Sequence, residues 1–450
     1  DSEKVYTSTR YSGIIAGYVG STTEEFAFNN GLKFLDLDTG EVIQKGQCGD
    51  DMTYSIKNGI LSITGSGEMY DDPSFRSNSE VTDIFIEEGV TAIGENAFKN
   101  FSKLRTVALP STLKDIGDYA FYQCSNLNSV TLPSGLENIG SYAFYNCKGL
   151  SSISIPGTVK TIDDRAFYYC NIRRLTLEDG IETIGNYAFA ENTINTIDIP
   201  ASVQVIGECA FGEPYYSIGS GVVTILNPEC DIIFSSNTFD TAYAIYSYGG
   251  STAEKYAFEY GRKFGDIETG KVKQEGKCGN DLLFSIEGNV LNITGTGDMW
   301  DEPLFRGNSS IVEVNIADGV TSIGKNAFDY MHMITMNIPA SVKKIDASAF
   351  GYSNQLSSFT VDKNNENFTV QNGVLMSKDK TKVVCYPCNK GGTEYKLDES
   401  ITAIEPDAFL NNNLTMLTIL NKDCIINGNI DLDVIIAGYK GSTAETFAYD

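Results

Sequence analysis

The most regular feature of the chain is a hydrophobic motif that recurs about every 23 residues. It reads Leu-x-x-Val/Ile-x-Leu/Ile-Pro, then Val/Leu-x-x-Ile-Gly, then Ala-Phe. The phenylalanines of successive Ala-Phe pairs are separated by 23, 23, 23, 22 and 22 residues, at Phe98, Phe121, Phe144, Phe167, Phe189 and Phe211. A fixed period of this length is typical of a solenoid in which each unit forms one coil.

A single unit predicts the path of one coil. Alternating apolar residues in Leu127–Leu132 predict a short strand with one buried face, which Pro133 ends. Leu136–Ile139 predicts a second short extended piece, Gly140 a turn, and Ala143-Phe144 a helical turn that packs its phenylalanine inward. Burying about six apolar side chains at roughly 1.5–3 kcal/mol each cannot offset ordering costs of roughly 1.5 kcal/mol per residue. The unit is therefore expected to be stable only when stacked on its neighbours.

A second repeat is ten times longer. Gly17–Thr22 returns as Ser247–Thr252, and Cys48–Asp51 returns as Cys278–Asp281, each with an offset of 230 residues. A third start appears at Gly438–Glu445. The chain is therefore predicted to hold two copies of one module, taken from a parent protein that continues in both directions.

Each module begins with the same predicted elements. A Gly-Ser-Thr stretch followed by glutamate predicts a capped helix, at Ser21–Asn30 and again at Ser251–Tyr260. Two alternating segments around Asn58-Gly59 then predict a β-hairpin that covers the open edge of the first coil. The predicted hairpin strands are Met52–Ile56 with Ile60–Thr64 and Leu282–Ile286 with Val290–Thr294.

These elements predict a repeat solenoid of mostly short β-strands with short helical turns, in two tandem capped modules joined by a helical segment. The predicted boundaries are an end-cap helix and linker at 1–45, module 1 at 46–240, a second end-cap helix and linker at 241–275, and module 2 at 276–450. Module 2 is irregular, because Phe350 and Phe409 are 59 residues apart. An inserted hairpin is expected at about 362–395.

The segment Ile139–Pro156 resembles the BspA-like leucine-rich repeats of bacterial surface proteins, and the motifs Cys48–Ile56 and Gly438–Glu445 resemble that family's caps. The resemblance implies a leucine-rich repeat protein that is extracellular or at the cell surface and acts in adhesion. It implies a protein partner, either a host matrix protein or another surface protein, with a glycan as the alternative. It carries no fixed catalytic residues and no cofactor, so a binding protein rather than an enzyme is expected.

Charge and composition narrow the possible partners. Asp and Glu total 59 against 33 Lys and Arg, which gives a net charge of −26. Nucleic acid and anionic membrane surfaces would both be repelled by this balance. No apolar run approaches the roughly 18 residues of a membrane span, so this segment is not expected to insert directly into a membrane. The single histidine, His332, leaves little scope for metal sites or catalytic triads.

The ten cysteines are the main candidates for chemistry. The set spaced by 23 residues fits a column of buried thiols better than a metal or redox ladder, and four single cysteines are expected to pack near the caps and last coils. Cys385 and Cys388 form a CxxC pair after a strand-like run, where a local disulfide or two free thiols is favoured. A thiol redox enzyme using this pair remains the remote alternative. The 23-residue set is Cys124, Cys147 and Cys170, and the single cysteines near caps and last coils are Cys48, Cys278, Cys230 and Cys424.

Three acidic motifs have weaker functional interpretations. Asp36–Gly40 resembles the start of a calcium loop but lacks the closing acidic residue, so an ordinary turn is expected. Tyr70–Pro73 and Trp300–Pro303 are interpreted as linkers between cap and repeats, with an aromatic contact to sugar as the alternative.

The best candidate surface is the exposed side of the strand ladder, because solenoids bind partners along such extended faces. Short hydroxyl side chains dominate the predicted outward positions, with Phe85 as an apolar anchor. A structural spacer that displays another domain of a longer surface protein is the competing hypothesis. The outward positions in module 1 are Asp83, Phe85, Thr106, Ala108, Ser129, Thr131, Ser152, Ser154, Arg174, Thr176, Thr196 and Asp198.

Overall fold

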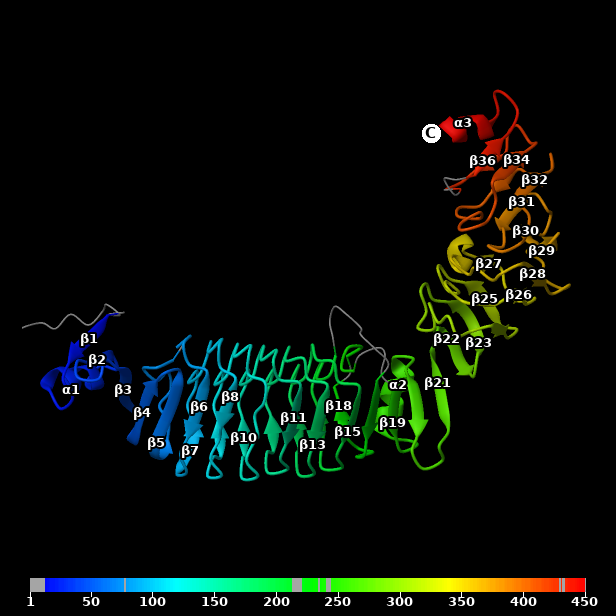
Figure 1. Cartoon of the computed structure of the whole chain (residues 1–450). Coiled ribbons are helices and arrows are strands. Elements are labelled where there is room, and N and C mark those ends of the chain that lie inside the picture. Colours follow the sequence, from blue (N-terminus) through cyan, green and yellow to red (C-terminus); the bar gives the residue numbers. More distant parts are fainter. Residues whose placement is uncertain are drawn as a thin grey trace, which may run out of the picture. The chain divides into compact units, whose positions relative to one another are not determined.

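The computed structural model describes residues 13–76, 78–212, 221–233, 235–239, 244–428, 430 and 434–449. The described residues form a β-solenoid of short strands with three short α-helices: α1 (Thr22–Asn29), α2 (Thr252–Glu259) and α3 (Thr443–Tyr449) (Figure 1). Contacts divide the chain into two compact units, and each is described here by itself. Unit 1 comprises 1–256 with 265–270, and unit 2 comprises 257–264 with 271–450.

Unit 1 begins with an antiparallel sheet that carries the predicted hairpin. Its strands β4 and β5 pair along their length, and Asn58 and Gly59 adopt the positive φ angles of 52° and 79° that a tight turn requires. A further strand, β3, pairs with β4 and extends the hairpin to three strands. The elements before the repeats are β1 (Ile14–Gly17), α1, β2 (Lys33–Asp36), β3 (Val42–Gly49), β4 (Asp51–Lys57) and β5 (Ile60–Glu68).

Strand β5 is long enough to start both ladders of the solenoid. Ile60–Ile63 pairs in parallel with β6, and Gly67–Glu68 pairs in parallel with β7. The same side of the solenoid continues through β6 (Asp83–Ile86), β8 (Thr106–Ala108), β11 (Ser152–Ile155), β13 (Arg174–Leu177), β15 (Thr196–Ile199), β17 (Val222–Ile225) and β19 (Ala244–Ser247). Within this first ladder, β11 and β13 form a separate two-stranded sheet. The second continues through β7 (Val90–Ile93), β9 (Asp115–Ile116), β10 (Asn138–Ile139), β12 (Thr161–Ile162), β14 (Thr183–Ile184), β16 (Val205–Ile206) and β18 (Asp231–Ile232). In the coil of Leu127–Leu132 the predicted strand is reduced to one bridge, between Ser129 and Thr106.

On the third side of each coil, the structure differs in detail from the predicted helical turn. Ala120 N–H donates to Gly117 O three residues back, whereas Phe121 N–H donates to Ala143 O in the next coil at 2.7 Å. Tyr119 and Gln123 take positive φ angles of 55° and 59°. The segment is therefore a run of single turns in which alternate N–H groups bond within the coil and to the next coil.

The interior of unit 1 is a column of buried phenylalanines. Neighbouring rings from Phe121 to Phe239 stack with centroids 5.0–5.8 Å apart, and Phe98 is tilted against Phe121 at 5.1 Å. Offset stacking adds about 0.5–1.5 kcal/mol per pair to area burial. The 22–23-residue period therefore corresponds to one ring of this column per coil.

Unit 2 repeats the same plan. Strands β21 (Val272–Lys277), β22 (Gly279–Glu287) and β23 (Val290–Met299) form the antiparallel cap, and β23 again starts two parallel ladders. The strands that follow are β24 (Glu313–Ile316), β25 (Val320–Ile323), β26 (Thr335–Ile338), β27 (Lys344–Ile345), β28 (Ser358–Val361), β32 (Glu394–Leu397), β33 (Ala403–Ile404), β34 (Met416–Ile419), β35 (Ile425–Ile426) and β36 (Ile435–Ala437). One coil has a 3-10 helix, η1 (Ala347–Phe350), and β20 (Lys263–Asp266) follows α2.

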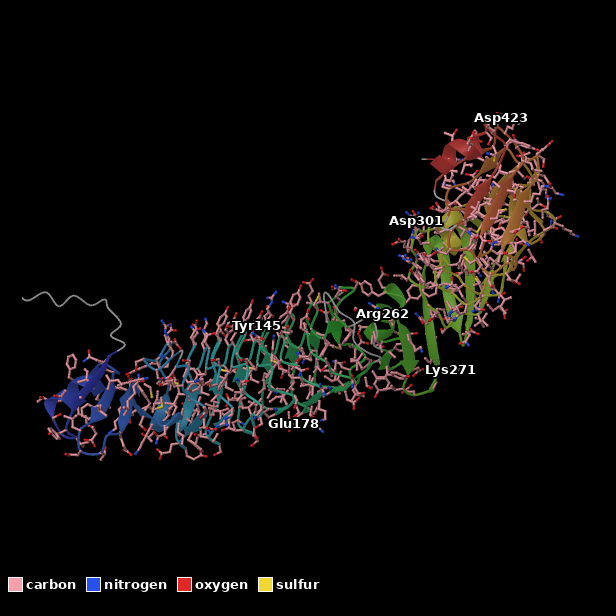
Figure 2. All side chains as sticks on the ribbon, turned by 45° about the horizontal axis from the view of Figure 1, so that its top comes forward. Tyr145, Glu178, Arg262, Lys271, Asp301 and Asp423 are labelled. Carbon is pink, nitrogen blue, oxygen red and sulfur yellow. The ribbon has the colours of Figure 1, made fainter. Side chains whose placement is uncertain are left out.

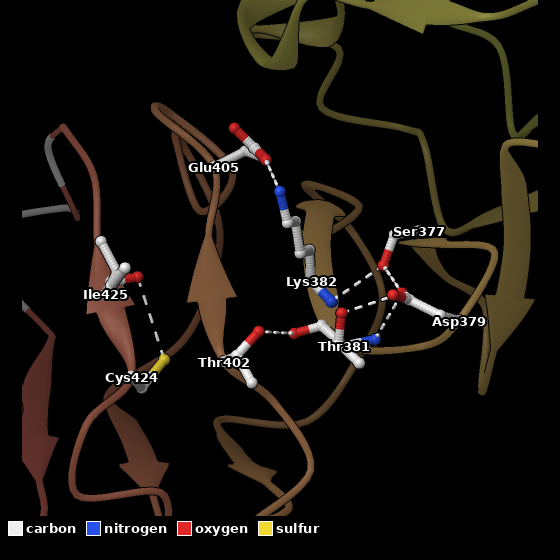
Figure 3. A network of polar contacts seen from close by, with 8 residues as sticks. All are labelled: Ser377, Asp379, Thr381, Lys382, Thr402, Glu405, Cys424 and Ile425. Carbon is white, nitrogen blue, oxygen red and sulfur yellow. Dashed lines mark hydrogen bonds and ion pairs between the residues drawn. The ribbon is translucent and has the colours of Figure 1, made fainter.

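A hairpin of β29 (Phe368–Gln371) and β30 (Val374–Ser377) interrupts the repeats of unit 2. The next strand, β31 (Lys382–Cys385), pairs antiparallel with β30 and parallel with β33, so it returns the chain to the ladder. Asp379 closes the intervening turn by accepting hydrogen bonds from Ser377 Oγ at 2.6 Å and Thr381 Oγ1 at 2.8 Å (Figure 3). These bonds lower the pKa of Asp379 to about 2.

Candidate functional site

The predicted outward residues of the first ladder do face solvent. All except Asp83 are exposed, and Phe85 has an exposed fraction of 53%. Asp83 is half-buried, because its carboxylate accepts hydrogen bonds from Thr106 Oγ1 at 2.5 Å and Thr82 Oγ1 at 2.7 Å. The Thr106 bond contributes most to lowering the pKa of Asp83. Asp83 therefore supports the strand ladder and has few acceptor positions left for a ligand.

The register of the paired strands places only some of these residues opposite one another. Asp83 is opposite Thr106 and Phe85 is opposite Ala108, while Ser152 and Ser154 are opposite Arg174 and Thr176. Thr196 and Asp198 pair instead with β17. The resulting surface, here called the strand face, consists mainly of short side chains that offer little contact area. Serine and threonine are under-represented among residues that dominate binding energy.

A second surface of unit 1, here called the tyrosine face, was missed by the sequence prediction. It lies on the turn side of the coils, and Tyr145 and Glu178 mark opposite edges of the array in Figure 2. Its aromatic members are Tyr119, Tyr122, Tyr142, Tyr145, Tyr168, Tyr169 and Tyr187. Tyr169 is exposed to solvent, and the other six side chains are half-buried.

These tyrosines stack in two columns that run from coil to coil. In the first column the rings of Tyr119 and Tyr142 are 4.9 Å apart and inclined by 7°. In the second, Tyr145 stacks on Tyr122 at 4.8 Å and on Tyr168 at 5.2 Å, inclined by 11° and 5°. Each ring therefore covers the face of its neighbour and leaves mainly its edge for a partner.

Cations complete the tyrosine face. Lys99 Nζ lies 4.8 Å from the ring centroid of Tyr119 and 5.2 Å from that of Tyr122. The Arg165 guanidinium lies 4.5 Å from the ring of Tyr187 and also contacts Tyr142, whose hydroxyl accepts a hydrogen bond from it at 3.2 Å. Cation–π contacts of this kind contribute about 0.5–1 kcal/mol at exposed sites.

The backbone beneath the first column is unusual for bulky residues. Tyr119, Tyr142 and Tyr187 have φ angles of 55°, 57° and 56°, and Arg165 has 56°. The left-handed conformation costs roughly 1–2 kcal/mol for such residues, whereas asparagine, found at Asn96, tolerates it better. The backbone N–H of each of these four residues donates to a carbonyl of the next coil at 2.8–3.0 Å, which helps to offset this cost. The repeated Tyr-Ala-Phe-Tyr sequence was the available signal for this face.

The thiols of unit 1 have a structural role. Cys124, Cys147 and Cys170 are fully buried, and each thiol donates to the carbonyl of a phenylalanine in the preceding coil at 3.1, 3.2 and 2.9 Å. Burial raises the pKa of Cys124 to about 12. Asn192 occupies the same position one coil later and bonds to Phe167 O at 2.8 Å.

Cys385 and Cys388 are both free and buried. Burial raises the pKa of Cys388 to about 11 and that of Cys385 well above its ordinary value. Since the thiolate is the reactive form, these values oppose nucleophilic or redox chemistry at neutral pH. No group of three or more possible metal ligands occurs among the described residues.

The other motifs singled out in the sequence behave as local structure. Asp36 accepts hydrogen bonds from Asp38 N–H at 3.1 Å and Thr39 Oγ1 at 2.6 Å, which closes an ordinary turn. Asp71 accepts from Glu95 N–H at 2.7 Å, which ties the linker to the next coil. His332 is exposed between two buried methionines. None of the described helices is long and apolar enough to cross a membrane.

The family model of the BspA type leucine rich repeat region matches residues 68–193, 138–218 and 291–384 in six copies, which covers more than half of the chain. The chain belongs to the BspA-type leucine-rich repeat family. This confirms the resemblance noted in Ile139–Pro156. Comparison with curated proteins gave no match.

Several solved protein structures are similar to this chain at low sequence identity. A leucine-rich repeat protein from Bacteroides ovatus is 18% identical, with coverage of 87% of this chain and 99% of that chain and a TM-score of 0.32. A leucine rich cell surface protein from Faecalibacterium prausnitzii is also 18% identical, with coverage of 89% and 96% and a TM-score of 0.24. The pneumococcal vaccine antigen PcpA is 14% identical, with coverage of 87% and 69% and a TM-score of 0.26.

Membership of the BspA-type family places the chain among bacterial leucine-rich repeat proteins, a class that suggests a protein-binding role. The family does not identify the partner or the binding surface. The two candidate surfaces of unit 1 must therefore be compared by their own chemistry.

Proposed function

We propose that this BspA-type protein acts at the bacterial cell surface as a protein-binding module, and that the tyrosine face of unit 1 is its contact surface. The observation that carries this proposal is the pair of columns of stacked tyrosines, with Lys99 at one end and with Arg165 between Tyr142 and Tyr187 in the first column. Tyrosine and arginine are enriched in interfaces and among residues that dominate binding energy. Tyrosine also provides large contact area at low entropic cost.

A protein fits the tyrosine face better than a glycan does. Sugar rings pack on exposed aromatic faces, but these rings cover one another at inclinations of 5–11° within the columns. Lys148 also lies 4.2 Å from the ring of Tyr169, the most exposed tyrosine of the set. The surface therefore offers ring edges and hydroxyl groups, which suit the mixed apolar and polar contacts of a protein interface.

The test compares one variant of each face. Tyr122→Ser/Tyr145→Ser/Tyr168→Ser removes one column, while the control Thr131→Ala/Ser154→Ala/Thr176→Ala changes the strand face. Both are measured for binding to a panel of host matrix proteins, bacterial surface proteins and glycans by biolayer interferometry, after circular dichroism confirms folding. We expect the tyrosine variant to weaken protein binding at least about tenfold, since truncating a dominant contact costs about 2 kcal/mol or more.

Three outcomes would overturn the proposal. Loss of binding in the strand-face variant alone would assign function to the surface predicted from sequence. Binding of glycans alone would show that the partner is a glycan rather than a protein. No binding by the wild-type chain at micromolar concentration would favour the structural spacer.

A further inference from the structure

The two copies of the module differ at one equivalent position in a way that exposes a lysine. In unit 1, Lys33 Nζ forms an ion pair with Glu80 Oε2 at 2.7 Å. The bond from Lys33 lowers the pKa of Glu80. In unit 2 the residues 230 positions later are Lys263 and Ser310, so the lysine is kept and its carboxylate partner is lost.

A hollow opens at this place in unit 2, and it is here called the lysine pocket. Its volume is about 390 Å³, within the range of small-ligand sites. The hollow lies between the cap strands β21 and β22 and the loop before β24. It is lined by Lys263, Val272, Lys273, Gln274, Ile286, Gly288, Asn308 and Ser310.

The lysine pocket is basic in a chain with a net charge of −26. Besides losing the acid, unit 2 gains a second cation, because Lys273 stands where unit 1 has Ile43. Glu275 holds the Lys273 ammonium at 3.1 Å. Lys263 is exposed, and no acidic group of the described part of unit 2 lies within ion-pair distance of it.

The neutral groups of the lysine pocket are committed to the protein itself. Ser310 Oγ donates to Asn308 Oδ1 at 2.6 Å, and Gln274 Nε2 donates to Gly261 O at 2.8 Å. Val272 is 51% exposed and Ile286 is buried, so they provide an apolar wall and floor. A ligand would therefore meet one ammonium group beside a small apolar surface.

We propose that the lysine pocket binds the carboxylate side chain of an acidic peptide segment, in the place that Glu80 takes in unit 1. The unit 1 pair shows which ligand chemistry this lysine position accepts: a carboxylate on a short aliphatic stem. The aliphatic stem would contact Val272 and Ile286. Because exposed ion pairs are weak, this contact alone gives low affinity.

The experiment uses the full chain with ¹³C-labelled lysine and the peptide acetyl-Gly-Glu-Gly-amide, with acetyl-Gly-Gln-Gly-amide as the neutral control. Lys263→Met assigns the NMR signal of Lys263. We expect the glutamate peptide to shift that signal in a saturable way at millimolar concentration, at least five times more than the glutamine peptide does. The shift should shrink as salt is added.

Matched substitutions exchange the carboxylate between the equivalent positions of the two units. Ser310→Glu supplies an internal carboxylate and should reduce the peptide-induced shift of Lys263 at least fivefold. Glu80→Ser removes the internal carboxylate of unit 1 and should make Lys33 respond to the peptide. Equal shifts with both peptides, or an unchanged response in Ser310→Glu, would overturn the proposal. A response to glucuronate but not to the peptide would also overturn it.

Discussion

At one position of the coil, three different side-chain types donate a hydrogen bond to a phenylalanine carbonyl. Cys147 Sγ donates to Phe121 O, Asn192 Nδ2 to Phe167 O, and Ser353 Oγ to Phe328 O at 2.6 Å. In each case the donor belongs to the coil after the phenylalanine. Phe121 O also accepts a hydrogen bond from Cys124 N–H at 3.1 Å, so the thiol is its second donor. One hydrogen bond contributes about 0.5–1.5 kcal/mol net to stability. The sequence predicted buried thiols, and the structure adds that they are hydrogen-bond donors.

This role predicts different effects for two substitutions of Cys147. Cys147→Val removes the second donor to Phe121 O and should lower the free energy of unfolding by about 0.5–1.5 kcal/mol. Cys147→Ser keeps a donor, as Ser353 does in unit 2, and should cost clearly less. Urea denaturation followed by circular dichroism makes the comparison. Equal losses in the two variants would show that packing alone matters at this position.

A buried carboxyl in unit 2 predicts a dependence of stability on pH. Burial raises the pKa of Asp329 to about 6 from 3.8, although Arg306 at 3.4 Å acts in the opposite direction. The folded protein therefore binds this proton more tightly than the unfolded chain does. The resulting stabilisation is complete below pH 3.8 and is lost as the pH rises through about 6.

Asp329→Asn should remove this dependence, because the amide has no charge to desolvate. At pH 7.5 we expect the variant to exceed the wild type in free energy of unfolding by about 1–3 kcal/mol. At pH 4 the two should differ little, and Arg306 keeps Glu302 at 3.1 Å as a partner. Denaturant unfolding at the two pH values is the measurement. A variant that is less stable than the wild type at pH 7.5 would contradict the explanation.

At the scale of the elements, alternation predicted those strands whose side chains alternate between solvent and core. The hairpin strands β4 and β5 and the outward residues of the strand face were found in this way. Strand β3 was not, because its burial does not alternate and its sequence includes Gly46 and Gly49. The sequence prediction took the run of turns for a helical turn, because a helical turn and a run of single turns both place an Ala-Phe pair inside the coil.

The tyrosine face could not be derived from any single unit. Tyr122 and Tyr145 are 23 residues apart in sequence, but their rings stack at 4.8 Å because successive coils are in register. This stacking can be predicted only when the coil pitch is known and when the side of the coil on which each tyrosine lies is known as well. Local patterns therefore predicted what each coil buries, whereas the surface made by many coils required the structure.

At the scale of the whole chain, the two copies keep their architecture while their charges are rearranged. Lys57 pairs with Glu41 at 2.7 Å in unit 1, and the equivalent residues in unit 2 are Glu287 and Lys271, with the signs exchanged. At the lysine pocket no such exchange restores the lost acid. The solenoid core therefore tolerates different arrangements of surface charge.

The helices that follow the coils, α2 and α3, are each bonded to the preceding coil through a threonine side chain. Thr252 Oγ1 in α2 donates to Cys230 O at 2.5 Å, and Thr443 Oγ1 in α3 donates to Cys424 O at 2.6 Å. Ala444 is buried in the core of unit 2, and β36 pairs with the last long strand, β34. These contacts cover an edge that would otherwise be open for pairing with another chain.

Ending the chain after Asn427 removes β36 and α3 together and leaves the edge of β34 exposed. We expect this truncated protein to associate, so light scattering after size-exclusion chromatography should give a mass above that of a monomer. The control Thr443→Val removes one side-chain bond but leaves β36 in place, and it should elute like the full chain. A truncated protein that stays monomeric at the same concentration would show that the edge of β34 needs no cover, since its backbone groups are then satisfied by water alone.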